Sequence, residues 1–297
     1  MLVTFEPSLL NTIDWRYFIA GGVAAAFSHG ISVPFDVIKT RIQLDPSLRN
    51  IGYRTHIQRI LQQEGVSAFS KGMGQTLIGY GIHGSLKYGV YHELKPVVSS
   101  FLFEAMGIQD QRLLVFILAA AMAELIGTLL LTPFESMRIR AVGQFSRNED
   151  ESHEVDVFRG LPALIARQVP YTVTQLSTLD VLSSFIYSNL EERHIYATTL
   201  SSELSIAFVV ALVAAALSTI VSHPGDTVMA VTNGVSHEDH GLKVEAIVKR
   251  IYEEEGVKGF FKGFRARLLH VSVIVVSQFL AYDSIEEFFG IPIANVH

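Results

Sequence analysis

Charged residues are rare in six long stretches of the chain. Residues 206–222 and 268–282 contain no Asp, Glu, Lys or Arg, and residues 113–132 contain only Glu124. Residues 15–33, 72–91 and 161–190 are mostly apolar with a few polar interruptions. Because an α-helix rises about 1.5 Å per residue, about 20 residues cross the hydrocarbon core of a bilayer. The pattern therefore predicts six membrane-spanning helices, with the buried helices of a soluble bundle as the alternative.

Two short motifs recur along the chain. The first reads PFDVIKTR from Pro34, PFESMRIR from Pro133 and PGDTVMAV from Pro224. The second reads EGVSAFSKG from Glu64 and EGVKGFFKG from Glu255, and only FRG at 158–160 remains of it between them. Motifs that recur in phase indicate tandem structural repeats. We expect three repeats, at residues 1–105, 106–197 and 198–297.

Each repeat is predicted to contain a helix with an internal proline, a short surface helix and a second long helix. Proline removes one backbone hydrogen bond and bends the helix around it. Residues 53–63 and 242–253 are amphipathic, which is typical of helices that lie on a membrane surface. The middle repeat has 20 positions between residues 140 and 160, against 31 between residues 41 and 72. Its surface helix is therefore predicted to be shortened by about three turns or absent.

The composition narrows the possible functions. Of the 297 residues, 49% are hydrophobic and 18% are charged, the net charge is −6, and there is no cysteine. The acidic balance argues against nucleic-acid binding, and the lack of cysteine excludes thiolate metal sites and cysteine nucleophiles. No arrangement of nucleophile, base and orienting residue indicates an enzyme, and we expect no metal or cofactor. Most Lys and Arg residues gather near the loops after the proline motifs, so these loops should face the more negative compartment.

The two motifs resemble the signature of the mitochondrial carrier family, P-x-[DE]-x-x-[KR]-x-[KR] followed by E-G-x-x-x-[FYW]-x-[KR]-G. The resemblance covers nearly the whole chain. Three segments are also similar to the phosphate carriers within that family: GY at 79–80 with KYGVY at 87–91, RQVPYT at 167–172, and IVSHPGD at 220–226. The resemblance implies an all-α barrel of six transmembrane helices with pseudo-threefold symmetry. It also implies transport of inorganic phosphate, with a proton or against hydroxide, by alternating access.

Three ionisable residues in or near the apolar stretches are candidates for proton coupling: His29, Glu124 and Asp226. Ionisable groups within a membrane are costly, and for that reason usually functional. Histidine changes its charge near neutral pH. The resemblance implies that these residues couple transport to a proton, and we expect His29 and Glu124 to act as a pair. The alternative is that the two side chains serve only in helix packing.

Phosphate requires cations inside the membrane, and Lys87 and Arg167 are the mid-span candidates. His83 precedes Lys87 by one helical turn, and Tyr171 follows Arg167 by one turn. The resemblance adds other positions, and the full expected binding set is His83, Lys87, Arg140, Arg167, Gln168, Tyr171, Gln175 and Arg267. Snorkelling to the membrane interface is the alternative role for Lys87 and Arg267. Gln175 stands where phosphate carriers usually have Lys, which leaves the identity of the anion open.

The resemblance also implies an ion-pair gate built from the proline motifs. The expected gate residues are Asp36, Lys39, Glu135 and Arg138, with Asp36 paired to Arg138 and Asp226 paired to Lys39. The base expected to pair with Glu135 would be at position 229, which is Met229, so at most two ion pairs are expected in this gate. The corresponding motif at the opposite end is incomplete at 91–95, 179–183 and 282–286. We therefore expect the resting protein to be closed on the side of the long loops.

The prediction as a whole is a monomeric, multi-pass carrier of the mitochondrial inner membrane. Its expected partners are inorganic phosphate, a proton and membrane lipid such as cardiolipin, with no nucleic acid. Two alternatives remain open. One is the same fold with another anion, such as a dicarboxylate or sulfate. The other is a carrier-derived membrane scaffold without transport, which the cost of buried cations disfavours.

Overall fold

The computed structural model describes residues 13–44, 53–107, 112–143, 157–192, 200–233 and 243–289. The described residues are almost entirely helical and contain no strand, so the predicted all-α class is confirmed. The elements are α1 (Trp15–Leu44), α2 (Tyr53–Glu64), η2 (Val66–Ser70), α3 (Met73–Met106), α4 (Arg112–Gly143), α5 (Leu161–Glu192), α6 (Leu200–Asn233), α7 (Val244–Glu255), η5 (Gly256–Phe261) and α8 (Phe264–Phe289).

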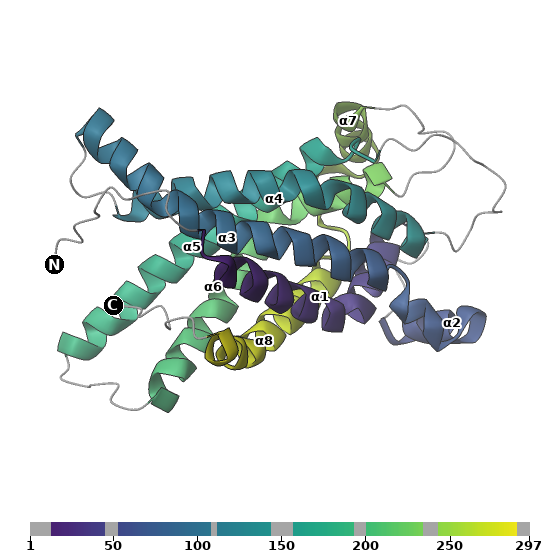
Figure 1. The fold of residues 1–297 in the computed structure, drawn as a ribbon. Coiled ribbons are helices and arrows are strands. Elements are labelled where there is room, and N and C mark those ends of the chain that lie inside the picture. The colour runs from purple at the N-terminus through teal and green to yellow at the C-terminus, as the bar shows by residue number, and fades with distance from the viewer. Residues whose placement is uncertain are drawn as a thin grey trace.

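The six long helices form a closed ring. In the order α1, α3, α4, α5, α6 and α8, each helix packs against the next, and α8 packs back against α1. Each predicted repeat contributes two neighbouring long helices to this ring. The short helices α2 and α7 lie at one end of the bundle (Figure 1). We call this end, where α1, α4 and α6 finish, the loop side.

Three of the described helices are long and apolar enough to cross a membrane: Trp15–Leu44, Leu113–Gly143 and Ser205–Asn233. These are the three proline-motif helices. The other long helices, α3, α5 and α8, have 34, 32 and 26 residues. They supply most of the polar side chains of a central cavity, and these side chains avoid lipid by facing inward.

The prolines of the repeated motif lie inside continuous helices. Pro34, Pro133 and Pro224 lie within α1, α4 and α6, and each of these helices continues past its proline to an end near the loop side. A proline in a helix leaves one carbonyl without its backbone partner and permits a bend. The acids and bases of the motif are therefore held on helices.

The second motif builds a compact turn before the second helix of a repeat. Gly65 and Gly72 in the first repeat, and Gly256 and Gly263 in the third, all have positive φ, which disfavours residues with a side chain. Lys71 Nζ lies 2.7 Å from Glu64 Oε2, and Lys262 forms the equivalent ion pair with Glu255. The glycines permit the backbone of the turn, and the ion pair between Glu and Lys links its two ends, which explains why the second motif has these residues in both repeats.

The predicted surface helices are present in the first and third repeats as α2 and α7. Each buries two side chains one turn apart, His56 and Ile60 in α2, and Ile247 and Ile251 in α7. In the middle repeat, residues 157–160 form turns before α5 begins. Residues 144–156, where a shortened helix could lie, are outside the described part of the chain.

Candidate functional site

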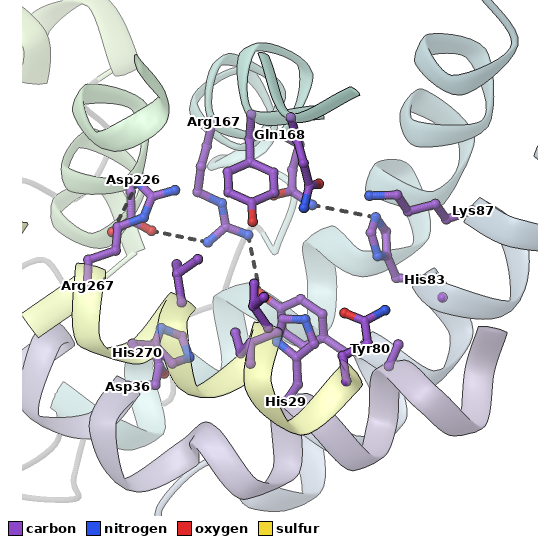
Figure 2. A pocket seen from close by; sticks show the side chains of 18 of the residues that line it. His29, Asp36, Tyr80, His83, Lys87, Arg167, Gln168, Asp226, Arg267 and His270 are labelled. Atoms are coloured by element: carbon purple, nitrogen blue, oxygen red, sulfur yellow. Dashed lines mark hydrogen bonds and ion pairs between the residues drawn. The ribbon is translucent and has the colours of Figure 1, made fainter. Parts of the chain in front are cut away.

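A cavity of about 140 Å³ lies at the centre of the ring. Its described wall comes from α1, α3, α5, α6 and α8 and includes His29, Asp36, Lys39, Tyr80, His83, Lys87, Arg167, Gln168, Tyr171, Gln175, Asp226, Arg267, His270 and Gln278. Figure 2 shows Arg267 and Asp226 on one side, Lys87 and His83 on the other, and Arg167 between them. Residues far apart in the sequence thus meet around one polar space.

Glu124 lies behind this wall and is fully buried. It projects from α4 toward α3 and α5. Lys87 Nζ lies 3.0 Å from its Oε2, and His83 Nε2 lies 2.8 Å from its Oε1. Gln168 Nε2 donates to Oε1 at 2.9 Å, and Thr172 Oγ1 donates to Oε2 at 3.1 Å. One carboxylate therefore joins three helices and holds the cavity lysine.

The structure brings His83, and not His29, into contact with Glu124. The His29 ring stacks on Tyr80 with ring centroids 3.6 Å apart, and the histidine that contacts Glu124 is His83. His29 lies on α1, whereas Glu124 lies on α4, and α3 stands between these two helices in the ring. His83, on the intervening α3, is the histidine within reach.

Arg167 occupies the centre of a second charged cluster. Its Nη1 lies 2.7 Å from Glu135 Oε1 and 3.3 Å from Asp226 Oδ1, and its Nη2 lies 3.4 Å from the hydroxyl of Tyr80. The side chain is 6% exposed. Two carboxylates from two different repeats therefore share one guanidinium, as expected of a buried charge that needs compensation.

Both ion pairs that the resemblance implied are formed. Lys39 Nζ lies 3.2 Å from Asp226, and Arg138 pairs with Asp36. Gln43 Nε2 adds a hydrogen bond of 2.8 Å to Asp226. The contacts link α1 with α4 and with α6 near the loop side.

The expectation of at most two bridges is wrong, because Glu135 also forms an ion pair with another helix. Position 229 is indeed apolar, but Glu135 binds Arg138 Nη2 at 2.8 Å and Arg167 Nη1 at 2.7 Å. The pairing implied by the motif involves only bases on the helices that contain the motif prolines. The base that Glu135 finds comes from α5.

The other expected binding residues divide into two groups. Tyr171, Gln175 and Arg267 line the cavity. Arg267 donates to the Ser222 carbonyl at 3.1 Å and to its Oγ at 2.7 Å. Arg140 is not among the residues that line the cavity, because two positions beyond Arg138 a side chain emerges from nearly the opposite side of a helix.

His270 is a cavity residue that the sequence interpretation missed. Its Nε2 lies 3.0 Å from Ser32 Oγ, and its Nδ1 lies 3.7 Å from Asp36 Oδ1. It is the one ionisable side chain in the apolar stretch 268–282 other than the tyrosine at its end. A single histidine in an otherwise apolar stretch was the feature of the sequence that could have predicted a site residue at this position.

The charges around the cavity do not balance. In the described residues of the two clusters, five cations (Lys39, Lys87, Arg138, Arg167 and Arg267) accompany four carboxylates (Asp36, Glu124, Glu135 and Asp226). Buried charges require compensation in a low-dielectric region. The excess cation among these side chains suits an anionic ligand.

The opposite end of the ring is described only in part. Lys95 Nζ lies 4.9 Å from the centre of the Tyr91 ring, and His92 stacks on Tyr17. The side chains of Asp180, Asp283 and Glu286 lie outside the described part of the structure. The described ion pairs that join helices across the ring lie at the loop side, where the proline motifs meet.

Comparison with known proteins agrees with this architecture. The profile described as "Mitochondrial carrier protein" matches residues 14–101 and 201–292. The chain is 28% identical to "Mitochondrial substrate carrier family protein N" of Dictyostelium discoideum, over 97% of this chain and 98% of the relative. It is 29% identical to "Probable mitochondrial phosphate carrier protein" of Schizosaccharomyces pombe, over 92% and 90%. It is 27% identical to human "Solute carrier family 25 member 3", over 93% and 78%. The chain therefore belongs to the mitochondrial carrier family, and it is a multi-pass transport protein of the mitochondrial inner membrane.

Proposed function

We propose that this carrier transports inorganic phosphate together with a proton by alternating access. The observation that carries the proposal is the cationic excess around a central cavity, with Lys87, Arg167 and Arg267 in its wall. Several relatives, from fission yeast, nematode and plant, are named as phosphate carriers. The proposal transfers that substrate to this chain.

Phosphate recognition would use two kinds of cation. Arg167 and Arg267 offer planar guanidinium groups that match phosphate oxygens, while Lys87 acts as a point charge. Gln168 and Tyr171 lie in the same wall and can donate hydrogen bonds. Lys87 and Arg167 already have carboxylate partners. Phosphate must therefore compete with a carboxylate for each cation, or that carboxylate must be neutralised.

Proton coupling follows from that competition at Lys87. A proton taken up by the pair His83 and Glu124 would remove the negative charge that holds Lys87. Lys87 would then be available to phosphate, and loss of the proton would favour release. This interpretation gives His83 the role expected of His29. Asp226, which contacts Lys39, Arg167 and Arg267, is better assigned to the gate than to proton uptake.

Another anion is the second candidate, and one residue favours it. Gln175 lines the cavity where phosphate carriers usually have Lys, so the wall has one cation fewer on α5. A dicarboxylate or sulfate also suits a cationic cavity. A scaffold without transport would have no use for these buried cations.

The test is uptake by the purified protein in liposomes, with phosphate, sulfate and malonate compared with and without a pH gradient. We expect phosphate uptake that increases when the outside is more acidic. Lys87→Ala should abolish it, whereas Lys249→Ala, an exposed lysine on α7, should leave it unchanged. Uptake of sulfate or malonate without uptake of phosphate would contradict the proposed substrate.

A further inference from the structure

The third proline motif lacks the base that the other two supply. Five positions after the proline, the first two motifs have Lys39 and Arg138, and the third has Met229. Met229 is fully buried in an apolar cluster with Leu131 and Ile139 of α4. Position 229 therefore contributes no charge to the gate.

Arg167 fills that gap from another helix. Glu135 lies one turn after Leu131 and one turn before Ile139, so it is on the face of α4 that packs around Met229. A base at position 229 would therefore be close to Glu135. Instead Arg167 on α5 contacts Glu135 at 2.7 Å and reaches Asp226 at 3.3 Å.

The third motif also differs in the residue after the proline, and this difference explains how Arg167 reaches the gate. The first two motifs have Phe35 and Phe134, and the third has Gly225. A Cβ atom at position 225 would lie only 2.7 Å from the Arg167 backbone nitrogen and 2.9 Å from the Ala166 carbonyl oxygen. The absence of a side chain allows α5 to pack directly on α6, which places Arg167 between Glu135 and Asp226.

We propose that Arg167 is the third base of the gate and that the same guanidinium binds the transported anion. Anion binding then opens the loop side, because it draws Arg167 away from Glu135 and Asp226. Arg167 is suited to both roles, since it lines the cavity while contacting both gate carboxylates. The anion's identity as phosphate rests on the proposed function, whereas the gate role does not.

The gate role can be tested with a thiol placed beside the gate. The chain has no cysteine, so Thr76→Cys gives a single reporter, in a small pocket with Asp36 and Arg138. In proteoliposomes without substrate, an impermeant thiol reagent applied on the loop side should label it slowly. Adding Arg167→Gln should raise the labelling rate about tenfold, and adding Met229→Lys as well should return it close to the parent rate. Phosphate uptake should remain absent in the triple variant. Unchanged labelling with Arg167→Gln, or no recovery in a folded triple variant, would overturn the proposal.

A second experiment tests whether Arg167 serves both the gate and the anion. It does not use Met229→Lys, so it can be done even if the variant with that substitution does not fold. Glu135→Gln removes the competing carboxylate, so phosphate should protect the full-length protein against thermal unfolding at about tenfold lower concentration. Unchanged protection in a variant that still binds phosphate would contradict competition. A different result would separate the two proposals. Phosphate would protect neither the parent nor Glu135→Gln, while sulfate or malonate would protect both, and at lower concentration in Glu135→Gln. The transported anion would then not be phosphate, and the gate role of Arg167 would still be supported.

Discussion

At the scale of single residues, the cavity cations are held by buried carboxylates, and these pairs determine what substitutions do. Lys87 illustrates this, because its ammonium contacts a glutamate that no solvent reaches. Removing one member of such a pair leaves the other charge buried without compensation. Stability and transport should therefore change together.

Lys87→Ala is predicted to destabilise the protein as well as to abolish uptake. Glu124 would keep His83, Gln168 and Thr172 but lose its lysine. We expect a loss of about 3 kcal/mol, because a buried carboxylate is left without its cation. Thermal unfolding in detergent measures the effect. The double variant Lys87→Ala/Glu124→Gln should recover part of the loss, and a double variant less stable than Lys87→Ala would refute the pairing.

His83→Gln is predicted to weaken proton coupling. Glutamine can still hydrogen-bond to Glu124 but cannot take up a proton near neutral pH. Phosphate uptake should persist while its stimulation by a pH gradient declines. His92→Gln is the control, since His92 stacks on Tyr17 outside the cavity wall. An unaltered pH response in His83→Gln would remove His83 from the coupling pair.

At the scale of elements, close helix contacts at glycines set the position of the cavity wall. A Cβ atom at Gly84 of α3 would lie 2.5 Å from the Gly21 carbonyl oxygen and 2.4 Å from the Ala25 Cβ atom. Small residues at helix interfaces permit such approach in membrane proteins. Because Gly84 lies between His83 and Lys87, this contact also positions both site residues.

Gly84→Ala is predicted to destabilise the protein and to impair uptake, because α1 and α3 must separate. Gly74→Ala is the matched control in the same helix. A Cβ atom at position 74 meets nothing within 4 Å, and alanine favours a helix by about 1 kcal/mol over glycine. Melting temperatures of the two variants should therefore move in opposite directions. Equal shifts would show that packing at Gly84 is not limiting.

The turn after α2 is predicted to stabilise the protein only above acid pH. Burial raises the pKa of Glu64, but the hydrogen bonds from Arg41 and Lys71 outweigh this effect, so the pKa lies below its ordinary value. A depressed pKa means that the stabilisation is complete above the unfolded-state pKa and is lost as the pH falls through the folded-state pKa. Glu64→Gln should lower the melting temperature at pH 7, and the gap from the parent should shrink below about pH 4.3. A gap that is constant from pH 7 to pH 3 would contradict this account.

At the scale of the whole molecule, the ring is tied together at the loop side and contains its polar space at the centre. The gate contacts join α1, α4, α5 and α6, which come from all three predicted repeats. Under the proposed alternating access, these contacts break together. Any ligand that opens the loop side must replace them with interactions of its own.

In the absence of substrate, we predict that a water-soluble reagent reaches the cavity more readily from the side opposite the loop side than from the loop side. Gln278 lines the cavity and donates to the Tyr88 hydroxyl, away from the gate. An impermeant thiol reagent on the side opposite the loop side should label Gln278→Cys readily. The same reagent on the loop side should label Thr76→Cys slowly. Rapid labelling of Thr76→Cys in the parent background would mean that the gate is not closed at rest.

Much of the architecture could be predicted because its signals are local. Six apolar stretches, three proline motifs and two glycine-containing signatures each lie within a short segment, and each corresponds to a helix or a turn of the structure. The composition of the cavity wall was also largely predictable, since an ionisable side chain in an apolar stretch is costly unless it faces polar surroundings. Lys87 and Arg167 were identified in this way, as was Glu124 behind the wall.

The sequence by itself determined which helices form, how they repeat and which charged side chains must turn away from lipid. Only the tertiary structure decided which charges meet. His83 and not His29 contacts Glu124, because α3 lies between α1 and α4. Arg167 and not residue 229 completes the contacts of Glu135, because Gly225 lets α5 approach α6. Such pairings join residues 32 to 59 positions apart, and they depend on helix order and on the closeness of packing rather than on any local pattern.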